Sequence, residues 1–133
     1  MTNEFGIKII SPSATHDSCR LKSVTVPGSQ GYMTILPGHA DMVAELGVGE
    51  LLVEASSSEK KPYFVSGGFV EVLGDEVIVL ADIVEAPGAI DVAAAEGEKV
   101  RVLKQLSGKS AESPELLAKA LKEAEYRIKI AKA

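Results

Sequence analysis

The sequence contains few of the residues that cross-link small proteins or bind metals in them. Its 133 residues include one cysteine, Cys19, two histidines and no tryptophan. A single cysteine excludes an internal disulfide and a multi-cysteine metal site, so we expect a reducing compartment. No uninterrupted apolar run reaches the roughly 18 residues of a membrane helix. Residues 1–4 lack the features of a signal peptide, so we expect a soluble protein.

Charge is distributed unevenly along the chain. Residues 1–87 carry 5 Lys/Arg against 12 Asp/Glu, a net charge of −7, and residues 88–133 carry 9 against 7, a net charge of +2. The acidic first part argues against nucleic acid, because phosphate binding needs clustered Lys and Arg. The basic tail would suit an acidic protein surface. A solvated helix face accounts for the same charges, so both interpretations stay open.

Residues 4–85 alternate apolar and polar side chains with the two-residue period of half-buried strands. The alternation slips by one residue between Leu21 and Val24, which predicts a β-bulge near Ser23. Gly74-Asp75 lies between two apolar runs and predicts a two-residue type II′ hairpin. Many short strands with frequent turns indicate a sandwich or barrel, so residues 1–87 form a predicted β domain.

The composition changes after Pro87-Gly88, and residues 88–133 form a predicted helical domain. Asp91 is the expected N-cap of a helix over residues 91–106. Ser113 followed by Pro114 predicts the start of a second helix. Its apolar stripe consists of Leu117, Leu121, Ala124, Ile128 and Ala131. Short amphipathic helices are marginal alone, so this hairpin must pack on another surface. The pattern does not decide between permanent packing and a switch between two surfaces.

Motifs for catalysis are incomplete. Gly108-Lys109-Ser110 would need a glycine five residues before Gly108 to form a phosphate loop, and Leu103 stands there. Ser66 would need glycine at 64 for a nucleophile elbow, and Phe64 stands there. Two histidines with neighbouring aspartates give too few convergent ligands for a metal site. We therefore expect neither enzyme activity nor a metal site.

Several ordered motifs carry a family resemblance. They are Val26-Pro27-Gly28, Gly31-Tyr32-Met33-Thr34, Ile35-Leu36-Pro37-Gly38-His39-Ala40 and the run from Val65 to Val72. Together they resemble the epsilon subunit of bacterial F-type ATP synthases, which is equivalent to the mitochondrial delta subunit. The resemblance implies a ten-stranded β-sandwich with a C-terminal antiparallel two-helix hairpin and no cofactor. The alternatives are a stand-alone ligand-binding β-sandwich and a small hydrolase.

The resemblance also implies a role and partners. The chain would be a non-catalytic rotor subunit of the central stalk, coupling the c-ring to the gamma subunit and inhibiting ATP hydrolysis through its helices. It would lie at the cytoplasmic face of the bacterial inner membrane, peripheral through the complex. The implied c-ring contact is the loop of Gly28, Ser29, Gln30, Gly31 and Tyr32.

His39 and Met42 are the implied gamma contacts, although turn geometry and core packing would explain the same residues. Basic residues of the second helix would face acidic loops of the catalytic alpha and beta subunits. These residues are Lys119, Lys122, Arg127, Lys129 and Lys132.

Some members of this family bind ATP at the folded hairpin. Five residues here match that pattern, namely Glu85, Ile90, Asp91, Ala95 and Arg127. Two do not, because Ala94 and Glu123 stand where arginines are expected. Charge-assisted hydrogen bonds dominate phosphate sites, so losing two cations and gaining an anion should weaken binding severely. We expect no ATP binding at physiological concentration.

Overall fold

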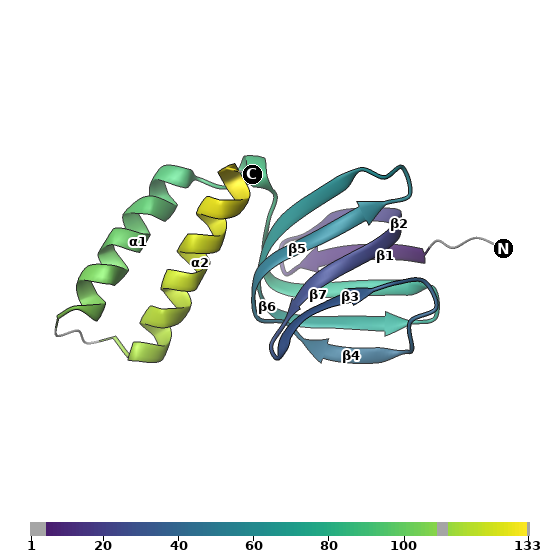
Figure 1. The fold of residues 1–133 in the computed structure, drawn as a ribbon, viewed down its shortest axis with the longest axis horizontal. Coiled ribbons are helices and arrows are strands. Elements are labelled where there is room, and N and C mark those ends of the chain that lie inside the picture. Colours follow the sequence, from purple (N-terminus) through teal and green to yellow (C-terminus); the bar gives the residue numbers. More distant parts are fainter. Residues whose placement is uncertain (1–4, 109–111, 133) are drawn as a thin grey trace.

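The computed structural model describes residues 5–108 and 112–132, and residues 109–110 of the incomplete phosphate-loop motif lie outside them. Seven strands come first and two helices follow (Figure 1). The strands are β1 (Phe5–Ser11), β2 (Ala14–Gly28), β3 (Gly31–Ile35), β4 (Met42–Glu45), β5 (Val48–Ala55), β6 (Lys60–Leu73) and β7 (Glu76–Glu85). A 3-10 turn, Pro87–Ala89, leads into α1 (Val92–Leu106) and α2 (Pro114–Lys132).

Hydrogen bonding closes the main strands into a ring. The order is β1-β7-β6-β5-β2-β3, β1 also pairs with β2, and β4 pairs with β6. The β1–β7 pair is parallel and the other pairs are antiparallel. A closed ladder leaves only the short strands β3 and β4 as edges among the described strands.

The expected number of ten strands is wrong, because the described residues form seven. Three long strands each serve both layers of the sandwich without a break. The first part of β2 pairs with β1 and its last part with β3. The first part of β6 pairs with β5 and its last part with β4. In β7, the first half pairs with β1 as well as β6 and the second half only with β6. Counting each of the three twice accounts for the difference.

Inward-pointing apolar side chains fill the space inside this ring. The fully buried ones include Ile7, Ile9, Leu21, Leu51 and Val65. Full burial of each such side chain contributes about 1.5–3 kcal/mol relative to exposure. Alternate residues of each strand therefore stabilise the sandwich core, as the two-residue period predicts.

Two local predictions, the bulge and the hairpin turn, are confirmed. The register between β2 and β5 shifts between Leu21 and Ser23, which is the predicted bulge. Gly74 has φ +60° while Asp75 has a negative φ, as a type II′ turn requires. Gly38, with φ +82°, follows Pro37 in a turn in which the His39 N–H donates to the Leu36 carbonyl oxygen (3.1 Å).

The glycine pair Gly67-Gly68 makes the bend inside β6. Gly67 has φ +72° and Gly68 φ +108°, values that side chains rarely allow. A Cβ on Gly68 would overlap the Leu80 carbonyl oxygen of β7. The Leu46 N–H donates to the Gly68 carbonyl oxygen (2.9 Å), so the bend also holds the residues after β4.

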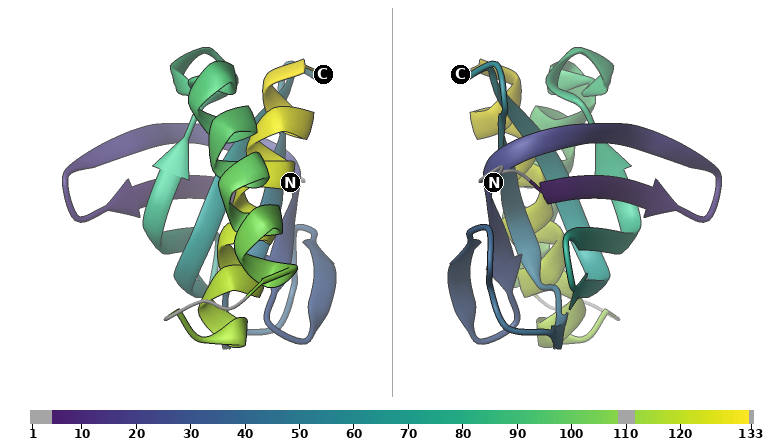
Figure 2. Two further views of the ribbon diagram at one scale, coloured as in Figure 1. Left: turned by 90° about the vertical axis from the view of Figure 1, so that its left-hand side faces the viewer. Right: turned by 90° about the vertical axis from the view of Figure 1, so that its right-hand side faces the viewer.

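The two helices form the predicted hairpin, and α2 lies between α1 and the sandwich (Figures 1 and 2). The Asp91 carboxylate accepts from the Ala94 N–H (3.0 Å) and Ser113 Oγ from the Leu116 N–H (3.1 Å), so both predicted caps are confirmed. No helix in residues 5–108 and 112–132 is long and apolar enough to cross a bilayer.

The predicted stripe of α2 is only partly the buried face. Leu117 and Ala124 are buried, whereas Leu121, Ile128 and Ala131 are half-buried. Ile130, which the stripe omits, is 0% exposed. A helix that packs on α1 and on the sandwich buries two faces, and a single stripe cannot show both.

We predict that Gly68→Ala lowers the free energy of unfolding by more than about 2 kcal/mol, because it combines a forbidden φ with backbone overlap. Gly97→Ala in α1 is the matched control, since an added Cβ meets nothing within 4 Å. It should raise stability by about 0.5–1 kcal/mol. Urea unfolding of the isolated chain measures both. Equal effects of the two substitutions would contradict this account of the bend.

Candidate functional site

The hairpin meets the sandwich through a small apolar cluster that is separate from the main core. Buried Val48 and Phe64 of the sandwich contact Ile130 of α2 and Ile90 from the linker. Ile83, Tyr126 and Ala131 are half-buried around them. Val48, Phe64 and Ile83 lie on the outer face of β5, β6 and β7, so α2 covers one face of the sandwich.

Arg127 links α2 to this face through two contacts. Its Nε donates to Glu85 Oε1 at 2.7 Å, with side-chain exposures of 24% and 31% for the two residues. Its guanidinium also lies 4.5 Å from the centroid of the Phe64 ring, a cation–π distance. The predicted ATP-site arginine is therefore already bonded within the chain.

Ser66 and Glu123 make the second polar link. Ser66 Oγ donates to Glu123 Oε2 at 2.7 Å, and Ser66 is only 1% exposed. The sequence analysis considered Ser66 as part of an incomplete nucleophile elbow and Glu123 as a position where an arginine is expected, and it did not pair the two residues. A serine facing a helix across 57 residues leaves no local signal that would predict the pair.

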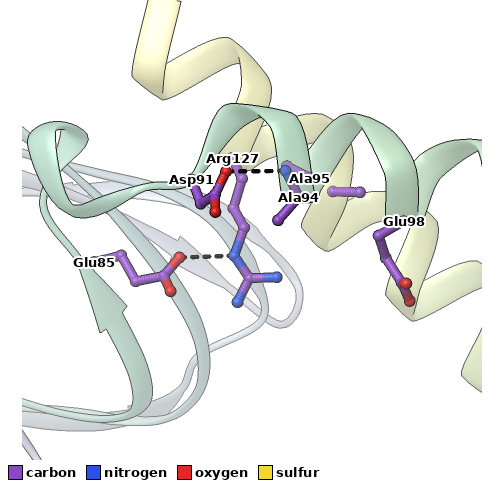
Figure 3. Close-up of a pocket in the computed structure, with 7 residues that line it drawn as sticks. Glu85, Asp91, Ala94, Ala95, Glu98 and Arg127 are labelled. Carbon is purple, nitrogen blue, oxygen red and sulfur yellow. Dashed lines mark hydrogen bonds and ion pairs between the residues drawn. The ribbon is translucent and has the colours of Figure 1, made fainter.

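The remnant of the ATP motif assembles into one pocket of about 320 Å³ (Figure 3). Glu85, Asp91, Ala95 and Arg127 line it together with Ala94, Glu98 and Ala124. Ile90 is instead buried in the apolar cluster.

The charges of this pocket do not suit a phosphate. Three carboxylates, those of Glu85, Asp91 and Glu98, stand against Arg127 alone. The Asp91 carboxylate already accepts the Ala94 N–H as a helix cap. Glu98, which the sequence pattern did not single out, pairs with Arg101 (2.7 Å), and the Arg101 hydrogen bond lowers its pKa. The ion pair with Arg101 therefore favours the charged form of the Glu98 carboxylate at this pocket.

The other predicted basic residues face solvent. Lys119, Lys122 and Lys129 are exposed, and Lys129 Nζ lies 5.7 Å from the Tyr126 ring centroid. Lys132 pairs with Glu96 of α1 at 3.1 Å. Arg127 differs from them because it is half-buried against the sandwich.

The predicted ring-contact loop connects β2 to β3. Ser29, Gln30 and Gly31 are exposed, Gly28 is half-buried, and the Ser29 N–H donates to the Glu45 carbonyl oxygen (2.8 Å). The loop lines a shallow pocket with Met33, Ala44 and Glu45.

Tyr32, the last residue of that loop set, has its hydroxyl turned back toward the chain. The hydroxyl accepts from the Glu50 N–H (3.0 Å) and neighbours the Tyr126 hydroxyl of α2. Burial, followed by the Tyr126 neighbour, raises the pKa of Tyr32 to about 12.

The two residues predicted for gamma contact lie in and after the turn before β4. Met42 is half-buried and packs against the sandwich core. His39 is half-buried, and its Nδ1 lies 2.8 Å from the Ala40 carbonyl oxygen. Core packing therefore accounts for the position of Met42, and turn geometry accounts for the position of His39.

Next to them lies an apolar surface that the sequence analysis did not identify. It consists of Val43 (67% exposed), Phe69 (51%), Leu73 (60%) and Leu80 (47%) on the outer face of β4, β6 and β7. We call these four residues the outer apolar face. Glu71 and Glu45 lie on the same face, paired with Val43 and Phe69, so charged groups alternate with these apolar side chains.

Comparison with known proteins identifies the class. The ATP synthase delta/epsilon chain β-sandwich domain matches residues 4–87. The epsilon chain of Koribacter versatilis is 37% identical over 106 residues, which is 80% of this chain and 74% of that one. The epsilon chain of Lawsonia intracellularis is 39% identical over 107 residues, covering 80% and 79% of the two chains.

A solved structure has the same fold over the whole chain. In the cryo-EM structure of the Euglena gracilis mitochondrial ATP synthase (OSCP, F1 and c-ring), a chain with 19% identity superposes with a TM-score of 0.86. The match covers 100% of this chain and 84% of that one. The chain therefore belongs to the delta/epsilon family of ATP synthase subunits. Its curated relatives within that family are epsilon chains.

We predict that calorimetry detects no ATP binding to the isolated chain at millimolar nucleotide, because three carboxylates surround one engaged arginine. Ala94→Arg combined with Glu98→Gln raises the pocket charge by two units and should produce measurable binding. The matched control, Ala93→Arg in the same Glu98→Gln background, adds its charge at an exposed neighbour that does not line the pocket. Binding by the unaltered chain would contradict this interpretation.

Proposed function

We propose that this chain is a non-catalytic coupling element that joins the c-ring to the gamma subunit of a bacterial F-type ATP synthase. It would lie at the cytoplasmic face of the inner membrane, attached through the complex. The observation that carries this proposal is the outer apolar face, which lies on the strand ladder and is left exposed by every element in residues 5–108 and 112–132.

The sandwich suits the transmission of torque because its strand ladder is closed. A force applied at the β2–β3 loop passes to β5, β6 and β7 through continuous backbone hydrogen bonds. Close-packed interiors have low compressibility and transmit strain. No bond chemistry is needed for such a part, which agrees with the incomplete catalytic motifs of the sequence.

The outer apolar face fits a partner that stays bound. Four large apolar side chains at 47–67% exposure would lose contact with water on binding, at about 25 cal/mol for each Å². Met42 begins β4 next to Val43 of this face, although its own side chain packs on the core side of the strand. We assign this surface to the gamma subunit.

The β2–β3 loop fits the polar loops of the c-ring. Ser29 and Gln30 are small or polar and exposed, and the loop base is held by the Ser29–Glu45 hydrogen bond and a bridge between Gly28 and Leu46. Hydrogen bonds at the base of this polar loop hold it in position, so it can contact a c-ring loop without a deep pocket.

The exposed lysines of α2 would contact acidic loops of the catalytic alpha and beta subunits and so oppose hydrolysis. Lys119, Lys122 and Lys129 are available in the present arrangement of the hairpin. Arg127 becomes available only when α2 leaves the sandwich, because Glu85 and Phe64 hold it.

The first prediction concerns assembly. Phe69→Asp with Leu80→Asp should reduce co-purification with the gamma subunit at least tenfold, because two charges would be desolvated in the interface. Ser57→Asp, at an exposed turn between β5 and β6, is the control and should assemble normally. Reconstitution followed by quantitative pull-down measures both. Normal assembly of the double variant would remove the outer apolar face from the proposal.

The second prediction concerns regulation. Removing residues 88–133 should raise ATP hydrolysis of the reconstituted enzyme while ATP synthesis continues, because torque passes through the sandwich. Lys122→Glu with Lys129→Glu should reproduce part of the increase, and adding a charge reversal at Arg127 should increase it further. Lys104→Glu, on the exposed surface of α1, is the control. Unchanged hydrolysis in the lysine variants would exclude inhibition by these charges.

A further inference from the structure

The attachment of the hairpin to the sandwich depends on α2. That helix contacts β5, β6 and the 3-10 turn, whereas α1 packs on α2. From α2, Ile130 is fully buried in the interface, and Tyr126 and Ala131 are half-buried. Because this apolar contact is small, polar groups contribute much of the specificity with which α2 docks on the sandwich.

Those polar groups form two parallel links one helical turn apart. Glu123 accepts from Ser66 Oγ (2.7 Å), and Arg127 donates to Glu85 (2.7 Å) while covering Phe64. Glu123 and Arg127 are separated by four residues and so lie on the same side of α2. Within the described chain, Ser66 is the buried polar residue, at 1% exposure.

The geometry fixes one docking register. If α2 shifted by a turn, Ser66 would stay covered without its acceptor, and an unsatisfied buried hydroxyl is unfavourable. When α2 leaves altogether, Ser66, Glu85, Glu123 and Arg127 all regain water. The contacts therefore favour one closed position and permit full release, but they disfavour intermediate positions.

We propose that Ser66, Glu85, Glu123 and Arg127 form an internal latch that closes the hairpin on the sandwich without any nucleotide. The adjoining pocket supports this, because its three carboxylates would repel the phosphates of a nucleotide. A nucleotide bound there would therefore not stabilise the closed hairpin. The Ser66–Glu123 bond sets the position, and the Arg127 contacts hold it. The latch is a property of the isolated chain and does not depend on the assembly proposed above.

Spin-label distance measurements on the full isolated chain test this. Labels at Lys8→Cys and Lys104→Cys, in a Cys19→Ser background, report the separation of the sandwich and the hairpin, because both sites are exposed. We expect a single narrow distance distribution without nucleotide and the same distribution with millimolar ATP. A broad distribution without nucleotide, or one that narrows when ATP is added, would overturn the proposal.

The variants identify the latch residues. Glu123→Ala should raise the ratio of open to closed chains about tenfold, as expected for a hydrogen bond to a charged group. Glu123→Gln, which keeps an acceptor, should stay mostly closed. Glu125→Ala, an exposed residue of the same helix, is the matched control. Equal populations in the Glu123→Ala and Glu125→Ala variants would overturn the role of Glu123.

Two further measurements separate release from unfolding. A label pair within the sandwich, Lys8→Cys with Ser57→Cys, should keep its distance in every variant that remains folded. Ser66→Ala combined with Glu123→Ala should open the hairpin no further than either single change, because the two residues form one bond. Additive opening would show that they act separately and would contradict the latch.

Discussion

The pairing of β1 with both β2 and β7 closes the strand ladder, and the rest of the structure depends on that closure. Without it, β1 and β2 would form a hairpin beside an open sheet with long unpaired edges. With it, the three long strands can pass between layers while their hydrogen bonds stay satisfied. Gly67 and Gly68, with positive φ values, permit the bend in β6. The result is a body stiff enough to present loops and faces at fixed positions.

Because the strand ladder is closed, the hairpin packs on the outer surface of the sandwich and does not contribute to its core. The sandwich core and the apolar cluster under α2 are separate groups of buried residues. Because the two do not merge, the helices can contribute or withdraw their contacts without loosening the strands. The chain thus combines a sandwich that has its own core with a helical hairpin that packs on its outside through a second, smaller cluster.

The sequence predicted features that depend on neighbouring residues, but it did not predict contacts between elements that are distant in the chain. Asp91, Ser113, Ser23 and Gly74 act within a few residues of themselves, so their caps, bulge and turn were predicted correctly. Ile130, Glu98 and the Ser66–Glu123 bond depend on which element faces which, and periodicity within one helix does not carry that information. The number of ten strands came from the family resemblance and not from the pattern, which does not count strands, and the three long strands that serve both layers account for the difference.

The meeting of Tyr32 with Tyr126 has a practical consequence. The chain has three tyrosines and no tryptophan, so its ultraviolet emission comes from tyrosine alone. Tyr32, next to the β2–β3 loop, and Tyr126 of α2 meet through their hydroxyl groups. Docking or release of α2 would change the surroundings of both tyrosine rings at once. The intrinsic tyrosine fluorescence of the native protein would therefore report the position of the hairpin.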